Sequence, residues 1–570
     1  MPEARAPGLV RRVAGDASRL PETLGPVVRR IYANRGVMQA AELDLSLARL
    51  LPPEFLNIEA AAVLLADALQ AQRRIVIAGD YDTDGATGTA LGVLGLRALG
   101  AQHVGYMVPN RFTMGYGLTP KLVAEIVQRG AELIVTVDNG IASVAGVAAA
   151  RAAGLDVIVT DHHLAPETCP DANVIVDPNQ PGCRFPSKCV AGVGVMFYVL
   201  LALRAELRRR GQFAVGTQPS LAEFLDLVAL GTVADVVRLD HNNRVLVAQG
   251  LARMRAGRCR PGILALLEVA HRDATRVGAP DLGFAVGPRL NAAGRLEDMH
   301  VGIECLLAPD LDTARPLAAQ LDAINRERRG IEQQMRDEAL ALLPDVPAGY
   351  GLCVYDPGWH EGVVGLVASR VRENTHRPTI AFAPASVAGE LKGSGRSIPG
   401  LHIRDALAAV DAAAPGLILR FGGHAMAAGL SLRGADYARF TELFDAACQQ
   451  ALQGCDLEET LETDGELTPQ ELSLETAQAL EAAGPFGQGF PEPVFDGGFQ
   501  VLDARPVGAD GRHVRYRLQS GATVINAIHF DGAETACASG SVHVAYALAV
   551  NRFRDNETPQ LLVKYLAAGA

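Results

Sequence analysis

The sequence predicts a multidomain α/β protein with a parallel sheet, a second α/β domain beyond a long helix, and a small C-terminal β-barrel. In residues 73–180, short apolar runs alternate with helical segments, which is typical of βαβ units in a sheet covered on both faces. Residues 311–345 combine helical periodicity with dense charge and predict one long helix. After residue 466, short strand-like segments at regular spacing indicate a barrel.

The elements of the first region follow one another in a regular order. Strands are expected at RRIVIAG, HVGYMVP, ELIVTVDNG, LDVIVTDHH and ANVIVDPN, with helices at TDGATGTALGVLGLRALG, TPKLVAEIVQRG and ASVAGVAAARAAG. A chain of 570 residues is long enough for roughly three to four domains. The predicted division is an N-terminal extension (1–45), a catalytic domain (46–310), a connecting helix (311–345), a second α/β domain (346–453) and a barrel domain (454–570).

The composition predicts a soluble cytoplasmic protein. Hydrophobic residues make up 49% of the chain, so sizeable cores can be buried. The nine cysteines include no CxxC pair, which indicates a reducing compartment rather than a disulfide framework. No stretch has the character of a signal peptide or a membrane span. The net charge of −12 does not exclude a nucleic-acid partner, because phosphates need only a local basic groove.

Polar side chains follow three of the predicted strands at the point where each strand ends. These residues are Asp80, Asp82 and Asp84 after the first strand, Asp138 and Asn139 after the third, and Asp161, His162 and His163 after the fourth. In open α/β sheets, sites form outside the carboxyl ends of the strands. Each Asp could instead cap the helix that follows it. Capping is a good explanation for an Asp at one strand end. It is a poor explanation for three strand ends, one of which also carries two adjacent histidines.

This collection of carboxylates and imidazoles indicates a metal site. Like charges held this close repel one another unless a cation lies between them. Carboxylates with one or two imidazoles suit Mn²⁺ or Mg²⁺ better than a thiolate-rich Zn²⁺ site. The candidate ligands exceed the needs of one ion, and two ions about 3.5–4 Å apart can activate water and hold a phosphate. The residues therefore predict a two-metal phosphoester hydrolase.

Several motifs resemble a known family. DYDTDGATGTA, VTVDNGI, VTDHH and VALGTVADVVRLDHNNR resemble the four motifs of the DHH phosphoesterase superfamily. AGVGVMFYVLLALR and GPRLNAAGRLEDMHVGIECLL are similar to the bacterial RecJ single-strand-specific exonucleases within it. GWHEGVVGLVASRV, LKGSGRSIPGLHIRDAL and RFGGHAMAAGLSL resemble the DHHA1 companion domain, and GPFGQGFPEPVF resembles the start of the RecJ oligonucleotide-binding (OB) domain. The resemblance runs in order from about residue 45 to the C-terminus.

The resemblance implies a set of metal ligands. One ion would be held by Asp82 and Asp138, and the other by Asp84, Asp138, His162 and the fourth-motif acid Asp235, which makes Asp138 the bridge.

The same resemblance implies roles for three neighbouring residues. His163 would lie near the scissile phosphate and its leaving oxygen. Asp161 would orient a histidine, as carboxylates commonly do beside a metal site. Asp80 is also a candidate ligand, either directly or through water.

A further set of residues is expected to contact nucleic acid. These residues are Arg111, Arg289, Asn291 and Arg295 in the first region, and His360, Arg396, Ser397 and His424 in the DHHA1-like region. Arg289, Asn291 and Arg295 could instead hold helix C-termini or pair with Glu297 and Asp298, and Arg396 could brace the interface between the lobes. In the barrel, Arg515, Tyr516, Arg552 and Phe553 are candidates for single-strand contacts, with packing as the alternative.

These observations and the resemblance together predict a metal-dependent 5′→3′ exonuclease that acts on single-stranded DNA and releases 5′-mononucleotides. The strand polarity comes from the resemblance alone. So does a role in recombinational and mismatch repair beside a single-strand-binding protein and a RecQ-type helicase, and the enzyme is expected to be a monomer. Two alternatives remain, a phosphodiesterase of short oligonucleotides or cyclic dinucleotides and a non-catalytic replication scaffold.

Overall fold

A computed structural model of the chain describes residues 8–111, 113–214, 216–343, 349–454, 457, 460–508, 511–554 and 556–569. The described chain divides into two compact units. The larger unit contains Arg11–Asn325 and the segment that begins at Thr463. The smaller unit contains Arg326–Glu462 and the described residues up to Val10. No helix among the described residues is long and apolar enough to cross a membrane.

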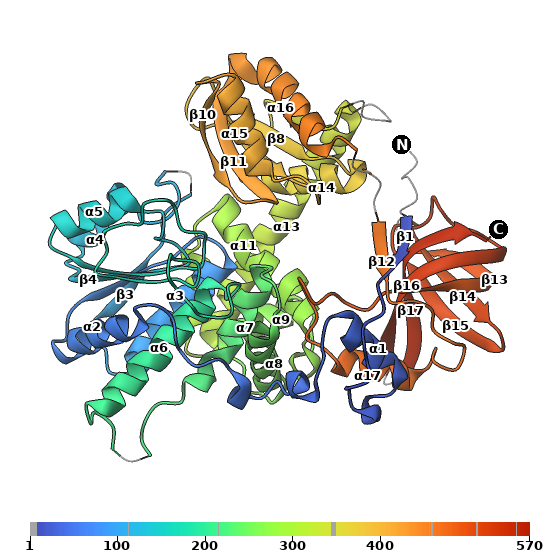
Figure 1. Cartoon of the computed structure of the whole chain (residues 1–570), viewed down its shortest axis with the longest axis horizontal. Helices are drawn as coiled ribbons and strands as arrows, with labels where there is room; N and C mark the ends of the chain where they lie inside the picture. Colours follow the sequence, from blue (N-terminus) through green and yellow to red (C-terminus); the bar gives the residue numbers. More distant parts are fainter. Residues whose placement is uncertain are drawn as a thin grey trace. The chain divides into compact units, whose positions relative to one another are not determined.

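The larger unit contains the expected parallel sheet (Figure 1). Its strand order is β3-β2-β4-β5-β6, and all neighbouring strands run parallel. The strands are β2 (Ile75–Ala78), β3 (Val104–Met107), β4 (Leu133–Val137), β5 (Asp156–Thr160) and β6 (Val174–Val176). Strands β2 and β4 are buried along their whole length, as the continuous apolar runs predict.

Helices cover both faces of this sheet. The helices are α2 (Ile58–Gln70), α3 (Thr83–Ala98), α4 (Pro120–Gln128), α5 (Val144–Ala152) and α6 (Gly192–Arg209). Alternate side chains of a strand point to opposite faces, so Ile75 and Ile77 join the core beneath α2, α3 and α6. Val76 and Ala78 join a separate core with α4 and α5. Because helices cover both faces of the sheet, polar side chains lie at the carboxyl ends of the strands.

A helical layer follows the sheet in the chain. It consists of α7 (Leu225–Ala234), α8 (His241–Arg255), α9 (Pro261–Val269), α10 (Ala279–Asp281), a π-helix (Leu282–Val286), α11 (Gly287–Leu296) and α12 (His300–Leu307). Helices α3, α6 and α7 pack against one another. The long helix expected from the charge pattern is α13 (Leu311–Leu342), whose residues belong to both units.

The smaller unit has a mixed sheet of order β10-β11-β9-β8-β7, in which only β7 and β8 pair in parallel. Its strands are β7 (Leu352–Tyr355), β8 (Thr379–Pro384), β9 (Glu390–Arg396), β10 (Ile418–Gly423) and β11 (Ala427–Arg433). Its helices are α14 (Val364–Thr375), α15 (Ile403–Ala413) and α16 (Tyr437–Leu452). A short two-stranded sheet pairs β1 (Gly8–Arg11) with β12 (Thr460–Thr463).

The C-terminal segment forms a closed barrel of order β13-β14-β15-β17-β16, as predicted. Its strands are β13 (Phe495–Val507), β14 (His513–Ser520), β15 (Thr523–His529), β16 (Gly540–Phe553) and β17 (Asn556–Ala568). The predicted N-terminal extension packs beside this domain through α1 (Pro26–Asn34), which contacts α17 (Leu474–Ala482). Arg35 and Asp464 form a buried ion pair there, with Nη1 and Oδ1 3.0 Å apart.

Candidate metal centre and nucleic-acid contacts

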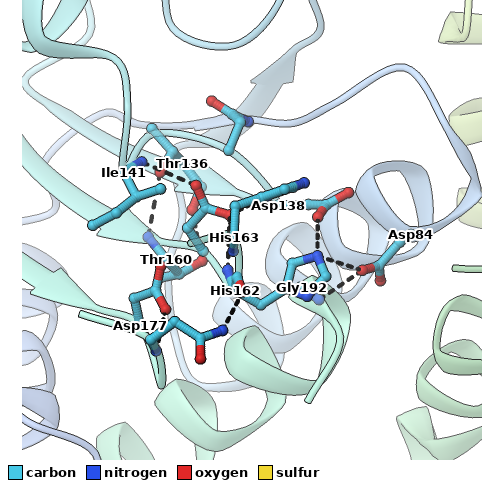
Figure 2. A network of polar contacts seen from close by, with 12 residues as sticks. Asp84, Thr136, Asp138, Ile141, Thr160, His162, His163, Asp177 and Gly192 are labelled. Carbon is cyan, nitrogen blue, oxygen red and sulfur yellow. Dashed lines mark hydrogen bonds and ion pairs between the residues drawn. The ribbon is translucent and has the colours of Figure 1, made fainter. Parts of the chain in front are cut away.

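The structure brings the predicted acids and histidines together at the carboxyl edge of the parallel sheet. Figure 2 labels four of them, Asp84, Asp138, His162 and His163. Asp80, Asp82 and Asp84 follow β2, Asp138 follows β4, Asp161, His162 and His163 follow β5, and Asp235 follows α7. Parallel strands end at the same edge, so three separate loops deliver side chains to one place. Asp138 turns sharply there, with a φ of 62° that non-glycine residues rarely adopt.

Three groups of side chains have ligand atoms within 4.8 Å of one another. The groups are Asp80–Asp82–Asp138, Asp84–His162–Asp235 and Asp138–His162–His163. Nε2 of His162 lies 3.0 Å from Oδ1 of Asp138 and 3.6 Å from Oδ2 of Asp235. Asp138 therefore lies between the first group and the second, at the place expected of a bridging carboxylate, and Asp80 lies with the first.

Burial and mutual repulsion make this cluster costly without a cation. Burial, followed by the charge of Asp82, raises the pKa of Asp84 to about 7. Burial and neighbouring carboxylates also raise the pKa of Asp80, Asp138 and Asp235 well above the ordinary range. Oδ1 of Asp80 is buried without a hydrogen-bond partner among the described residues. Four acidic groups that resist ionisation, one with an unused oxygen, fit a site built to hold divalent cations.

The N-terminus of α6 supports two of these acids. Asp84 accepts hydrogen bonds from the amides of Gly192 at 2.6 Å and Val193 at 2.9 Å (Figure 2). A Cβ atom at Gly192 would lie 2.6 Å from Cβ of Asp138, closer than real side chains approach. Glycine at 192 therefore allows the helix, with its positive dipole end, to come directly against both carboxylates.

His163 is fixed by Asp161, which agrees with the orienting role expected for that acid. Nδ1 of His163 lies 2.7 Å from Oδ1 of Asp161, whose other oxygen accepts from the amide of Ile141 at 2.9 Å. Burial opposes protonation of His163, but the Asp161 hydrogen bond and the surrounding carboxylates raise its pKa to about 9. The hydroxyl of Tyr116 lies 3.4 Å from Nε2 of His163. The sequence reasoning missed Tyr116, although it lies only five positions after Arg111.

The residues expected to contact nucleic acid near the metal cluster have mixed surroundings. Arg289 is buried and uses Nε and Nη1 to bond Asp322 at 2.9 Å and the carbonyl of Ala285 at 2.6 Å. Asn291 accepts hydrogen bonds from Thr83. These contacts engage both side chains within the protein, but the partners are not Glu297 and Asp298, the acids named in the alternative. Arg295, in the last turn of α11, and Arg111, over the Tyr81 ring at 5.1 Å, remain candidates for DNA contact.

In the smaller unit, Arg396 and Ser394 lie against the first turn of α14. Nη1 of Arg396 is 3.2 Å from Oγ of Ser394, and a Cβ at Gly365 would lie 2.9–3.0 Å from both side chains. Ser397, the predicted residue, is instead fully buried and donates its hydroxyl to the carbonyl of Leu401 at 2.8 Å. The expectation for Ser397 is therefore corrected in favour of Ser394, because residues two apart on β9 share a face.

The predicted histidines of this unit occupy turns. His360 precedes α14, and its Nδ1 accepts from the amide of Gly362 at 3.1 Å. His424 is exposed in the turn between β10 and β11. Both belong to the same unit as Arg396 and remain candidates for an anion contact.

The candidate DNA-contact residues of the barrel differ in whether their side chains point into the barrel or toward the solvent. Tyr516 lies inside the barrel, which agrees with the packing alternative and not with a surface contact. Arg515 and Arg517 lie on the outer face of β14, and Arg505 of β13 is directly opposite Arg515. Arg552 pairs with Glu481 and Glu557, so it braces α17 and the start of β17.

The domains match known families. Residues 74–232 match the family described as DHH family, N-terminal domain, residues 349–450 match the DHHA1 domain, and residues 463–565 match the RecJ OB domain. A protein of Dickeya dadantii named single-stranded-DNA-specific exonuclease RecJ is 53% identical over 98% of this chain and 98% of its own length. The protein of that name from Escherichia coli K12 is 51% identical over 97% of this chain and 98% of its own. The chain belongs to the RecJ family.

Solved RecJ structures resemble the whole fold. The crystal structure of RecJ in complex with Mn²⁺ from Thermus thermophilus gives a TM-score of 0.83 at 31% identity, over 98% of this chain and 79% of that one. Its counterpart in complex with Mg²⁺ gives 0.77 at 30% identity, over 98% and 78%. The predicted fold class, a DHH core with DHHA1 and OB domains, is thereby confirmed for this RecJ-family chain. The predicted domain boundaries stay a prediction.

Proposed function

We propose that this RecJ-family protein is a single-stranded-DNA-specific exonuclease that hydrolyses phosphodiesters with two divalent cations, Mn²⁺ or Mg²⁺. One observation carries the proposal, namely that three groups of possible metal ligands, two of which share Asp138, meet at one edge of the sheet. Asp80, Asp82 and Asp138 would hold one ion, and Asp84, Asp138, His162 and Asp235 the other. When bound, such ions supply Lewis acidity at the phosphoryl group and lower the pKa of water.

The chain's own residues supply positioning and proton chemistry around the phosphate. Asp161 holds His163 through Nδ1 and favours its protonated form, which leaves Nε2 to donate toward a phosphate or leaving oxygen. The amides of Gly192 and Val193 hold Asp84 in one orientation. Tyr116 borders His163 and narrows the directions in which that imidazole can turn.

A terminal 5′-phosphate would bind in the smaller unit. Arg396 offers a guanidinium, Ser394 a hydroxyl, and the first turn of α14 its backbone amides, which together suit a phosphate monoester. His360 and His424 are further candidates from the same unit. The proposed 5′→3′ polarity and release of 5′-mononucleotides rest on the family resemblance, and a 5′-phosphate site here would supply the end recognition that they require.

The outer face of the barrel would follow the strand beyond the cut. Arg505 and Arg515 lie opposite each other across β13 and β14, and Arg505 also pairs with Asp503, with Nε and Oδ2 2.9 Å apart. Arg515 and Arg517 are exposed on the same face of β14, so these two residues form a suitable track for phosphates. The family supports a setting in recombinational and mismatch repair, with a single-strand-binding protein and a RecQ-type helicase as proposed partners.

The test compares end-labelled substrates. Purified protein should degrade 5′-phosphorylated single strands to mononucleotides from the 5′ end with Mn²⁺ or Mg²⁺, spare blunt duplexes, and stop on addition of a chelator. Degradation from the 3′ end would overturn the polarity. Faster hydrolysis of dinucleotides or cyclic dinucleotides than of long strands would favour the short-oligonucleotide alternative, and DNA binding without hydrolysis would favour the scaffold.

A further inference from the structure

Thr83 lies between two of the proposed ligands, Asp82 and Asp84, and is the first residue of α3. The first amides of a helix have no partner within the helix and need an acceptor from elsewhere. Asp82, the N-cap residue, serves the third of them, since its Oδ1 accepts from the amide of Gly85 at 3.0 Å. The amide of Thr83 is served by a distant part of the chain.

That part is α11. Oδ1 of Asn291 accepts from the amide of Thr83 at 2.8 Å and lies 2.9 Å from its hydroxyl oxygen. The same hydroxyl lies 3.1 Å from the carbonyl oxygen of Gly287. Thr83 is 1% exposed, so water has little access to replace these contacts. Both polar groups of Thr83 therefore depend on α11.

The backbone of α11 also lies directly against the loop that carries the acids. A Cβ atom at Gly294 would be 1.8 Å from the carbonyl oxygen of Tyr81, so only glycine permits this approach. Asn291 and Gly294 are three positions apart and face the same side of the helix. Arg289 ties α11 to α13 through Asp322 at 2.9 Å. The helix is thus anchored on one side and holds residues 81–84 on the other.

We propose that Asn291 is a positioning residue for the metal-binding carboxylates, an inference that rests on the proposed function. By holding the backbone at Thr83, Asn291 sets the directions in which Asp82 and Asp84 leave the chain, and these two acids belong to different ligand groups. The side-chain oxygen of Asn291 already accepts hydrogen bonds from Thr83. Asn291 therefore has a structural role that differs from the DNA contact expected from the sequence.

The test measures metal binding directly. Mn²⁺ titrations followed by electron paramagnetic resonance should show binding weakened by about 10–100-fold for at least one ion in Asn291→Ala, as is usual when a ligand loses its support. The KM for single-stranded DNA at saturating Mn²⁺ should be unchanged, and raising Mn²⁺ should restore much of the lost rate. Thr83→Val, which removes only the hydroxyl, should give a smaller loss in the same direction. The loss of Mn²⁺ affinity in the double variant should be smaller than the sum of the losses in the two single variants, because both substitutions remove the same contact between Asn291 and the Thr83 hydroxyl.

Asn173 provides a matched control. Its Oδ1 accepts from the amide of Val157 at 2.7 Å and from Nη1 of Arg151 at 2.9 Å, at the amino end of β5 and away from the ligands. Asn173→Ala also removes an asparagine that accepts two hydrogen bonds. It should lower the melting temperature while leaving Mn²⁺ affinity at the wild-type value.

The outcomes separate this role from the proposed function. Wild-type hydrolysis together with unaltered Mn²⁺ binding in Asn291→Ala would overturn the positioning role alone, as would a raised KM for DNA with Mn²⁺ binding intact. Absence of metal-dependent hydrolysis by the wild-type protein would overturn the proposed function itself. If Asn291→Ala fails to fold, Thr83→Val decides, and wild-type Mn²⁺ affinity in that variant overturns the role.

Discussion

The metal centre and the outer face of the barrel both carry concentrated charge, but they are built in opposite ways. At the metal centre, Asp84 receives two backbone amides and Asp161 holds His163, all within buried surroundings. On the barrel, Arg515 is exposed and faces another arginine across the strands. Chemistry at a phosphate needs atoms fixed to a fraction of an ångström, whereas attraction of a polyanion needs only charge at the right distance. A charged side chain that is buried and held by several hydrogen bonds is thus suited to catalysis, and an exposed one with few contacts is suited to attracting DNA.

Removal of the shared carboxylate should produce the largest effect. Asp138→Ala takes a ligand from two groups at once, so hydrolysis should fall by at least about 10³-fold, the scale of losing a key electrostatic element. Binding to single-stranded DNA, measured by fluorescence anisotropy, should persist through the arginines of the barrel. Activity within tenfold of wild type would contradict the two-metal assignment.

The two adjacent histidines should separate by function. His163→Ala should lower kcat by about 10²–10⁴-fold, the range of general acid–base groups, and leave Mn²⁺ affinity nearly intact. His162→Ala should instead weaken Mn²⁺ binding, because its Nε2 lies among the ligands. Identical metal titrations for the two variants would show that this division is wrong.

The Arg396 site should show an intermediate effect. Arg396→Ala should raise KM by about one to two decades on 5′-phosphorylated strands, as expected for a lost charged hydrogen bond. The defect should be smaller on 5′-hydroxyl strands, and the melting temperature should not change. Ser394→Ala should act in the same direction, while Ser397→Ala should affect stability instead. Equal loss on both kinds of end with a lowered melting temperature would indicate a brace.

The barrel arginines should give the smallest and most salt-sensitive effect. Arg515→Ala and Arg517→Ala should each weaken single-strand binding only a few-fold and reduce the slope of log K against log salt by about 0.7, the value for one phosphate contact on a single strand. Arg552→Ala is the matched control, since Arg552 is engaged by Glu481 and Glu557. If the slope of log K against log salt is unchanged in the Arg515 and Arg517 variants, the outer face of β14 does not bind the phosphates of the strand.

The sequence predicted which acids and histidines after β2, β4 and β5 lie together, because the loops after parallel strands meet at one edge of the sheet, whereas Asp235, which follows α7, came from the resemblance. It failed where the decisive information was the direction of a side chain or a distant partner. Ser397, a candidate for DNA contact, follows the last residue of β9 and is buried. Tyr516 was a candidate beside Arg515 with packing as its alternative, and it packs inside the barrel because neighbours in a strand point to opposite faces. That alternation was available from the sequence. The hydrogen bond between Asn291 and Thr83, which are 208 positions apart, could not be predicted from the sequence, because no local pattern shows which helix packs against a given loop.

The contact between α1 and the barrel domain has a consequence for synthesis of the chain. Arg35 meets Asp464 429 positions later, and the hydroxyl of Tyr32 bonds the carbonyl of Ala483. At about 5–20 residues per second, a ribosome needs about 20–90 s to make the intervening segment. Throughout that interval, the side of α1 that meets α17 lacks its final partners, so the packing of α1 is completed long after the helix is made. Chaperone occupancy on nascent chains should therefore be prolonged at this end.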